Sequence, residues 1–395
     1  MLRFALILGL LSAVGPFAID MYLPALPMIE GDLGASVAAT QMTLTAYFIA
    51  FGLAQLVYGP WSDQVGRKPP LYLGLGIFAV ATVGCALSPS IGWLIAFRAM
   101  QGLGGAVLMV VPRAIIRDRY TGVEGTKLMA MVMLVISVSP MLAPLAGSGL
   151  LLVGGWRLLF WAMFAAAGAS LLVTAFAFRE TLAPDMRVPI NFANLRRGAL
   201  VLLRDPVFMG LTMIGGFGMA SFFVFLANAA FVYTDQFGLT PTGFSIAFAV
   251  NAIGFFGASQ AAGPLGARFG MVAVMRNAII GFALITAALT LVVALGGGTL
   301  YVIIAGLALG NACLGLVIPT TMVMALDDHG DIAGLASSLG GTLQMLVGGV
   351  MMVLSAQFFN GTALPMVAAI ALCALAALGL SLWIMGRVGQ PSAAT

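Results

Sequence analysis

The chain is 395 residues long, carries a formal net charge of +4, and combines 62% hydrophobic residues with only 8% charged ones. Soluble domains average about 25% charged residues and less than half apolar ones, so a water-surrounded core could not bury this excess. A disordered chain is excluded for the same reason, and three cysteines leave an odd one for a disulfide scaffold. We therefore expect an integral membrane protein with little mass outside the bilayer.

Twelve apolar segments are long enough to cross a bilayer as helices, which takes about 20 residues each. They are expected at 4–25, 41–60, 70–88, 91–112, 128–153, 155–178, 207–233, 243–265, 271–295, 299–325, 333–358 and 363–386. A membrane β-barrel would show short alternating segments instead, and in lipid the backbone hydrogen bonds must close within helices. A cleaved signal peptide is the alternative for the first segment, but its apolar run continues as far as Asp20.

Basic residues indicate the orientation of the spans. With the N-terminus in the cytoplasm, every Lys and Arg except Arg98 and Arg157 falls at or near a cytoplasmic end. The positive-inside rule then predicts that both termini are cytoplasmic. These residues are scattered over short loops and do not form the clustered patch of a nucleic-acid-binding protein. The expected partner is therefore the lipid bilayer and not nucleic acid.

The spans fall into two halves around a polar stretch. We expect an N-terminal six-helix bundle at 1–178, a cytoplasmic linker at 179–206 with an amphipathic piece at 192–203, and a C-terminal six-helix bundle at 207–395. The sequence GPWSDQVG at 59–66 is echoed half a chain later by GPLGARFG at 263–270, with Gly, Pro and Gly in register. Two parallel repeats with a cleft between them are a known plan of transporters.

Ionisable residues at bilayer depth are costly and point to function. At ~1.5 Å of rise per residue, Asp20 and Arg98 lie at a similar depth in neighbouring predicted spans. We interpret them as a buried pair in which Asp20 gains and releases a proton. The alternatives are a static salt bridge that fixes helix packing, or an Asp20 that lies inert at the outer interface. Arg113 lies near a cytoplasmic end, where its side chain reaches the interface or else enters a pocket.

The second half contains no acid or base in the middle of a span. Its candidates for an apolar cavity with a few amides are Phe222, Phe225, Asn228, Asn251, Asn311 and Gln344. From the first half we add Asp20, Tyr22, Tyr47 and Arg113 as candidate substrate-binding residues. Each of the second-half residues has packing as its alternative role.

Enzymatic chemistry finds little support. The acidic segment around His329 has residue types that bind metals, but we interpret it as a solvated turn. The chain contains no nucleophile–base set, phosphate loop or metal-ligand spacing elsewhere. We expect no enzyme activity, no metal and no cofactor other than a proton gradient.

Five motifs resemble one family of transporters. The loop at 59–68 (GPWSDQVGRK) resembles the signature between helices two and three of the major facilitator superfamily. The motifs at 98–102 (RAMQG) and 140–147 (PMLAPLAG) are similar to those of its proton-driven exporters. The segments 17–27 (FAIDMYLPALP) and 331–338 (DIAGLASS) resemble the bicyclomycin/chloramphenicol-resistance branch of the twelve-helix drug:proton antiporters. The resemblance implies two pseudo-symmetric six-helix bundles.

The resemblance also implies roles for single residues. Asp20 is expected to couple protonation to substrate binding, with Arg98 near it. Asp63, Arg67 and Asp118 are expected to form a cytoplasmic charge cluster that holds the outward-facing state. Two departures from the family pattern are Gln64, in place of the usual arginine, and Ser148, in place of a second glycine. The candidate gating residues are Asp63, Arg67, Asp118, Pro140, Pro144 and Gly147.

The expected function is export of lipophilic, neutral or weakly charged antibiotics in exchange for protons, by alternating access. The expected location is the bacterial inner membrane, with a monomer as the working unit and drugs, protons and lipid as partners. The alternative is a proton-coupled importer or exporter of a small metabolite with the same fold.

Overall fold

The computed structural model describes residues 2–120, 122–176 and 179–384, and in these ranges the regular structure is entirely helical. The first half contains α1 (Leu2–Asp20), η1 (Leu23–Ala25), α2 (Leu26–Asp32), α3 (Val37–Val65), α4 (Lys68–Ala86), α5 (Ile91–Gly105), α6 (Val107–Arg119), α7 (Gly122–Val153) and α8 (Arg157–Phe176). The second half contains η2 (Pro184–Met186), α9 (Phe192–Arg204), α10 (Pro206–Phe231), η3 (Val232–Gln236), α11 (Pro241–Phe269), α12 (Met271–Ala294), α13 (Leu300–Asp327), η4 (Gly330–Ile332), α14 (Ala333–Gln357) and α15 (Ala363–Ile384).

The expected all-α fold with twelve spans is confirmed. Within the described residues, twelve segments are long and apolar enough to cross a membrane. Four of them join shorter helices end to end, as in the first span, which runs over Ile7–Asp32. The sequence prediction ended that span at residue 25, whereas α2, with a proline in its first turn, continues it to Asp32. The residues expected to form an amphipathic piece, 192–203, lie in the helix α9.

The structure divides into two compact units. Unit 1 comprises 1–190, 226–250 and 352–361, and unit 2 comprises 191–225, 251–351 and 362–395. The second-half segments in unit 1 are hydrogen-bonded to the first half: Gln41 Nε2 donates to the Ala227 carbonyl at 3.1 Å, and Ser245 Oγ donates to the Pro144 carbonyl at 2.8 Å. The division therefore follows side-chain contacts rather than span boundaries, and the bundles at 1–178 and 207–395 remain predictions from the sequence.

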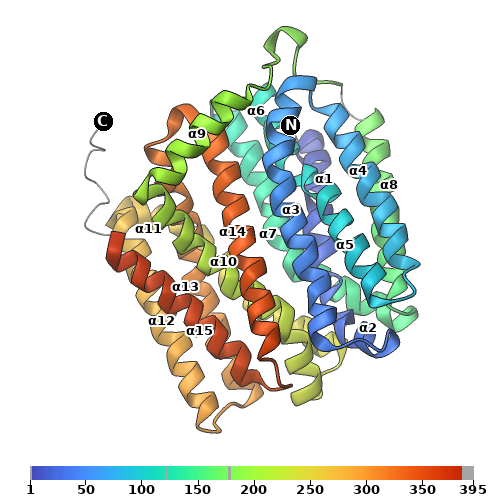
Figure 1. Ribbon diagram of the computed structural model, residues 1–395, viewed down its shortest axis with the longest axis vertical. Coiled ribbons are helices and arrows are strands. Elements are labelled where there is room, and N and C mark those ends of the chain that lie inside the picture. The colour runs from blue at the N-terminus through green and yellow to red at the C-terminus, as the bar shows by residue number, and fades with distance from the viewer. Residues whose placement is uncertain (1, 121, 177–178, 385–395) are drawn as a thin grey trace. The chain divides into compact units, whose positions relative to one another are not determined.

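Close helix contacts organise unit 1. In Figure 1, α4 runs beside α5 and α8, and α5 lies against α3. Glycines make this approach possible. A Cβ added to Gly102 on α5 would collide with the backbone oxygen of Tyr47 on α3, and one on Gly104 would meet the backbone of Phe78 on α4. Apolar attraction does not draw helices together in lipid, so small residues at the contact are what allow tight packing.

Unit 2 is organised around α12, which packs against α13 and α15. Elsewhere in unit 2, the His329 ring forms a hydrogen bond with the Asp205 carboxylate at 2.8 Å and contacts the ring of Phe208 edge-on. The acidic segment near His329 therefore contacts the start of α10. Among the described residues, no group of three or more His, Cys, Asp or Glu side chains is placed to hold a metal ion.

Replacing Gly102 by alanine tests the α3–α5 contact. In a helix interior, alanine is about 1 kcal/mol more favourable than glycine, whereas overpacking against neighbouring groups costs about 1–3 kcal/mol. Because the atom that a Cβ meets is backbone, we expect Gly102→Ala to lower the melting temperature of the purified protein. Gly92→Ala on the same helix adds its Cβ to open space and should leave that temperature unchanged or raise it. Equal melting temperatures for the two variants would contradict the close approach.

Candidate functional site

Arg98 on α5 is fully buried inside unit 1. Its Nη1 donates to the Ala18 carbonyl of α1 at 3.1 Å and to Gln101 Oε1 at 2.5 Å. Gln101 Nε2 in turn donates to Thr82 Oγ1 on α4 at 2.7 Å. This chain of hydrogen bonds connects three helices through one guanidinium group.

Two tyrosine rings enclose the same guanidinium group. The Arg98 Cζ lies 4.5 Å from the ring centre of Tyr22 and 4.6 Å from that of Tyr47. Both rings are fully buried, and Tyr22 is held in place by a 2.9 Å hydrogen bond to Thr43. Aromatic faces attract cations, and the attraction strengthens where water is excluded. The contact stabilises a buried charge, because Nε and Nη2 of Arg98 find no hydrogen-bond partner among the residues that the structure describes.

Asp20, the last residue of α1, is 5% exposed. No ion pair within 4.0 Å or hydrogen bond joins its carboxylate to Arg98 in the described part of the chain. Asp20 and Arg98 therefore lie in one region, as their estimated depths predicted, but the direct pair expected from the sequence is not formed in the described structure. The Ala18 carbonyl, two residues earlier on α1, takes the Arg98 hydrogen bond instead.

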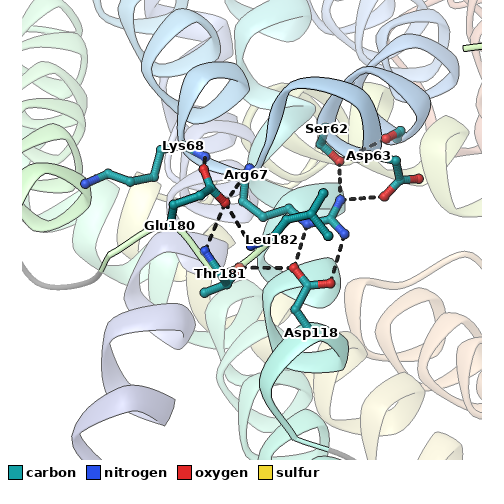
Figure 2. A network of polar contacts seen from close by, with 9 residues as sticks. Ser62, Asp63, Arg67, Lys68, Asp118, Glu180, Thr181 and Leu182 are labelled. Carbon is teal, nitrogen blue, oxygen red and sulfur yellow. Dashed lines mark hydrogen bonds and ion pairs between the residues drawn. The ribbon is translucent and has the colours of Figure 1, made fainter. Parts of the chain in front are cut away.

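The expected charge cluster assembles around Arg67, which is 4% exposed and follows α3 (Figure 2). Its Nη1 donates to Ser62 Oγ at 2.9 Å and to Asp63 Oδ1 at 2.5 Å. Its Nε and Nη2 bind both oxygens of Asp118 on α6, at 2.7 and 2.9 Å. Burial alone would lower the pKa of Arg67, but its bonds to Asp118 and Asp63 outweigh burial and raise it. The cluster is complete without Gln64, whose side chain is exposed.

Glu180, which the sequence analysis missed, anchors the turn that carries Arg67. Its carboxylate accepts the backbone N–H groups of Arg67 at 2.8 Å and Lys68 at 3.0 Å, and those of Thr181 and Leu182 at 2.9 and 3.1 Å. Figure 2 shows this carboxylate between the start of α4 and the linker. Partial burial raises the pKa of Glu180, but these four N–H donors outweigh it and lower the pKa overall. The sequence contained a signal for this contact: an acid, Glu180, follows span six, and the first N–H groups of the helix that begins at Lys68 need an acceptor.

The candidate gating residues of α7 lie at two contacts within unit 1. The Pro144 carbonyl accepts the hydroxyl of Ser245 from α11, as described above. A Cβ on Gly147 would collide with the Met21 carbonyl, directly after Asp20. Pro140, with Pro144, lies inside a helix that nevertheless continues from Gly122 to Val153. The α7 motif is therefore packed against the segment that carries Asp20.

The candidate cavity residues are distributed over both units. In unit 1, Asn228 accepts a 3.0 Å hydrogen bond from Gln41 Nε2. Arg113 on α6 is partly exposed, and within the described ranges its covered Nε has no hydrogen-bond partner.

In unit 2, Phe222 stacks on Phe255 at 5.6 Å and contacts Phe225 at 6.4 Å. Asn311 Nδ2 donates to Asn251 Oδ1 at 3.2 Å, and both side chains are buried. Gln344 is partly exposed, and a Cβ on Gly215 would lie 2.6 Å from its Nε2. The two asparagines of α11 and α13 satisfy each other, whereas Gln344 keeps some accessible surface.

We predict that Glu180→Gln lowers the melting temperature at neutral pH, because an amide accepts the four N–H groups less well than a carboxylate. A lowered folded-state pKa means that the stabilising effect is present above the ordinary glutamate value of 4.5 and is lost as the pH falls through the folded value. The difference between wild type and variant should therefore shrink on acidification. Glu124→Gln removes an exposed acid of α7 as the control. A difference that stays constant with pH would contradict the anchoring role.

Comparison with known proteins places this arrangement in a family. The chain is 34% identical over 397 residues to the uncharacterized MFS-type transporter YdgK of Bacillus subtilis, covering 99% of this chain and 98% of that protein. It is 28% identical to a bicyclomycin resistance protein homolog of Haemophilus influenzae, over 94% of this chain and 93% of the relative. It is 31% identical to multidrug resistance protein D of Escherichia coli, over 89% and 88%. The resemblance to the drug-resistance branch is thereby confirmed.

Solved structures agree on the fold. A peptide transporter POT structure in complex with sulfate superposes with a TM-score of 0.77 at 15% identity, covering 98% of this chain and 95% of the other. The D-xylose-proton symporter gives 0.73 at 15% identity, over 96% and 97%. The model of the Major Facilitator Superfamily itself matches residues 8–352. The chain therefore belongs to the Major Facilitator Superfamily, whose members are transporters and not enzymes.

Proposed function

We propose that this chain exports lipophilic, neutral or weakly charged drugs across the bacterial inner membrane in exchange for protons. The observation that carries the proposal is the buried carboxyl group of Asp20, which has no cationic partner within 4.0 Å among the described residues, while the nearby Arg98 is held by other groups. The names of the drug-resistance relatives support the drug as cargo.

The surroundings of Asp20 suit a group that carries a proton in one state and loses it in another. An ionised carboxylate at bilayer depth is costly unless a partner lies close by. The Arg98 donors that remain unpaired, Nε and Nη2, belong to the same region and supply such a partner after a local rearrangement. In our proposal, Asp20 is neutral in the described arrangement, and its ionised form draws on Arg98.

The exchange cycle uses this change in charge. Drug enters from the cytoplasm or the inner leaflet while Asp20 releases its proton, and a proton from outside returns to Asp20 to reset the carrier. One charge crossing the membrane is worth about 2.3 kcal/mol per 100 mV, and one pH unit about 1.4 kcal/mol. Exchange of one proton for a neutral drug uses both terms, whereas exchange for a monovalent cation uses only the pH term.

The remaining residues have supporting roles in this proposal. Arg67, with Asp63 and Asp118, holds the cytoplasmic gate of the outward-facing state, and the α7 motif at 140–147 controls the packing next to Asp20. Substrate contacts are assigned to Tyr22, Tyr47 and Arg113, and to the six aromatic and amide candidates of the second half. We further propose a monomer with both termini in the cytoplasm. A metabolite importer of the same fold is the competing function, and the direction of transport distinguishes the two.

Replacing Asp20 by asparagine tests the coupling. We expect Asp20→Asn to fold and insert but to lose the accumulation of chloramphenicol that an imposed proton gradient drives in inside-out vesicles. Asp32→Asn is the control, because Asp32 is a half-exposed acid of the same span that pairs with Arg157 at 2.8 Å. Full proton-driven accumulation by Asp20→Asn would overturn the coupling role, and accumulation only in right-side-out vesicles would indicate import.

Replacing Arg98 by alanine tests the other partner. The change removes the bonds to Ala18 and Gln101 together with both tyrosine contacts, so we expect at least a tenfold loss of transport rate. Arg157→Ala removes a half-exposed surface arginine, and exposed ion pairs contribute at most about 1 kcal/mol, so its transport rate should stay near wild type. Unchanged transport by Arg98→Ala would leave the residue with a packing role only.

A further inference from the structure

Arg113 is a cation that neither the coupling pair nor the charge cluster uses. It lies on α6, six residues before that helix ends at Arg119, between the buried residues Pro112 and Ala114. Among the described residues it forms no ion pair within 4.0 Å and no hydrogen bond, and its Nε is completely covered. Arg113 lies within a membrane span, where an arginine without a protein partner calls for an explanation even near the cytoplasmic end.

Arg113 lies on the accessible side of α6. Met109, Val110 and Arg113 are partly exposed and Arg117 is exposed, at the spacing of one helix face. The remaining sides of the helix pack against α1, α3, α4 and α7. Arg113 is therefore the charged group on a stripe that is otherwise apolar until the helix end.

Arg98 and Arg113 differ in what can reach them. Arg98 is enclosed by the rings of Tyr22 and Tyr47, and its Nη1 is already occupied by Ala18 and Gln101. Arg113 keeps accessible surface. The acid nearest to it along α6, Asp118, already binds Arg67 with both of its oxygens. Of these two arginines, Arg113 is the one whose guanidinium group keeps surface that an anionic or strongly accepting group of a ligand can reach.

We propose that Arg113 binds an acidic or strongly hydrogen-bond-accepting group of the transported molecule, so that the preferred substrates are lipophilic compounds with such a group rather than cations. The planar guanidinium presents paired N–H donors that match a carboxylate or sulfonate. The stripe of Met109 and Val110 supplies an adjacent apolar surface for the rest of the molecule. This inference rests on the proposed function and specifies its substrate class.

Two fluorescent probes with one skeleton test the inference. 1-Anilinonaphthalene-8-sulfonate is anionic, and N-phenyl-1-naphthylamine is its neutral counterpart. Affinities are measured by equilibrium dialysis against the full chain in phosphatidylcholine nanodiscs, with empty nanodiscs subtracted. We expect Arg113→Gln to weaken sulfonate binding about tenfold and binding of the neutral probe less than twofold. Arg113→Lys should restore part of the loss, and Arg117→Gln, which removes an equal charge one turn away, should change sulfonate binding less than twofold.

Several results would overturn the inference. One is equal weakening of both probes by Arg113→Gln, which indicates a structural role; another is no weakening of either. Addition of anionic phosphatidylglycerol to the nanodiscs tests the other source of the same chemistry, because competition with the sulfonate would assign Arg113 to a lipid phosphate. Proton-driven chloramphenicol accumulation by the wild-type chain is measured in parallel. If this accumulation is present but probe binding does not depend on Arg113, the inference is refuted and the proposed function stands. If the accumulation is absent, the proposed function is refuted and the binding result stands.

Discussion

The cost of placing a charge at bilayer depth governs the polar residues of this chain. Three arginines of the first half meet that cost differently. Arg98 is held between two tyrosine rings and a backbone carbonyl, and Arg67 binds two carboxylates and a hydroxyl at the edge of the span. Arg113 forms no such bonds with the described part of the chain and keeps accessible surface. The first two arrangements suit residues that work within the protein, and the third suits one that meets a ligand.

Glycine contacts bring the helices that carry these charges into range of one another. Gly102 and Gly104 seat α5 against α3 and α4, which sets the distance at which Tyr47 covers Arg98. Gly147 seats α7 against the carbonyl of Met21, beside Asp20. The α7 motif, which resembles that of exporters, thus packs against the residue next to the one proposed to carry the proton. Any movement of α7 would displace the backbone at Met21, because close-packed interfaces transmit strain.

The charge cluster depends on the linker as well as on the helices. Glu180 fixes the backbone around Arg67, and Thr181 Oγ1 donates to Asp118 Oδ2 at 3.0 Å. Val188 N also donates to the Asp63 carbonyl at 3.0 Å. The segment after span six is therefore part of the cluster and not merely a tether between the halves. A change of state that breaks the cluster must also change the surroundings of this segment.

The sequence by itself determined the twelve helices, because long apolar runs have one stable conformation in lipid. Its resemblance to the family signature also indicated Asp63, Arg67 and Asp118 as a charge cluster, although only Asp63 lies one turn from Arg67 in the sequence. Only the tertiary structure decided that Arg98 bonds Ala18 and lies between Tyr22 and Tyr47, because depth estimates along single helices carry no information about which faces meet. The role of Glu180 likewise depended on the linker lying against the turn that carries Arg67 and Lys68. Contacts between residues distant in sequence are set by packing, and no local pattern encodes them.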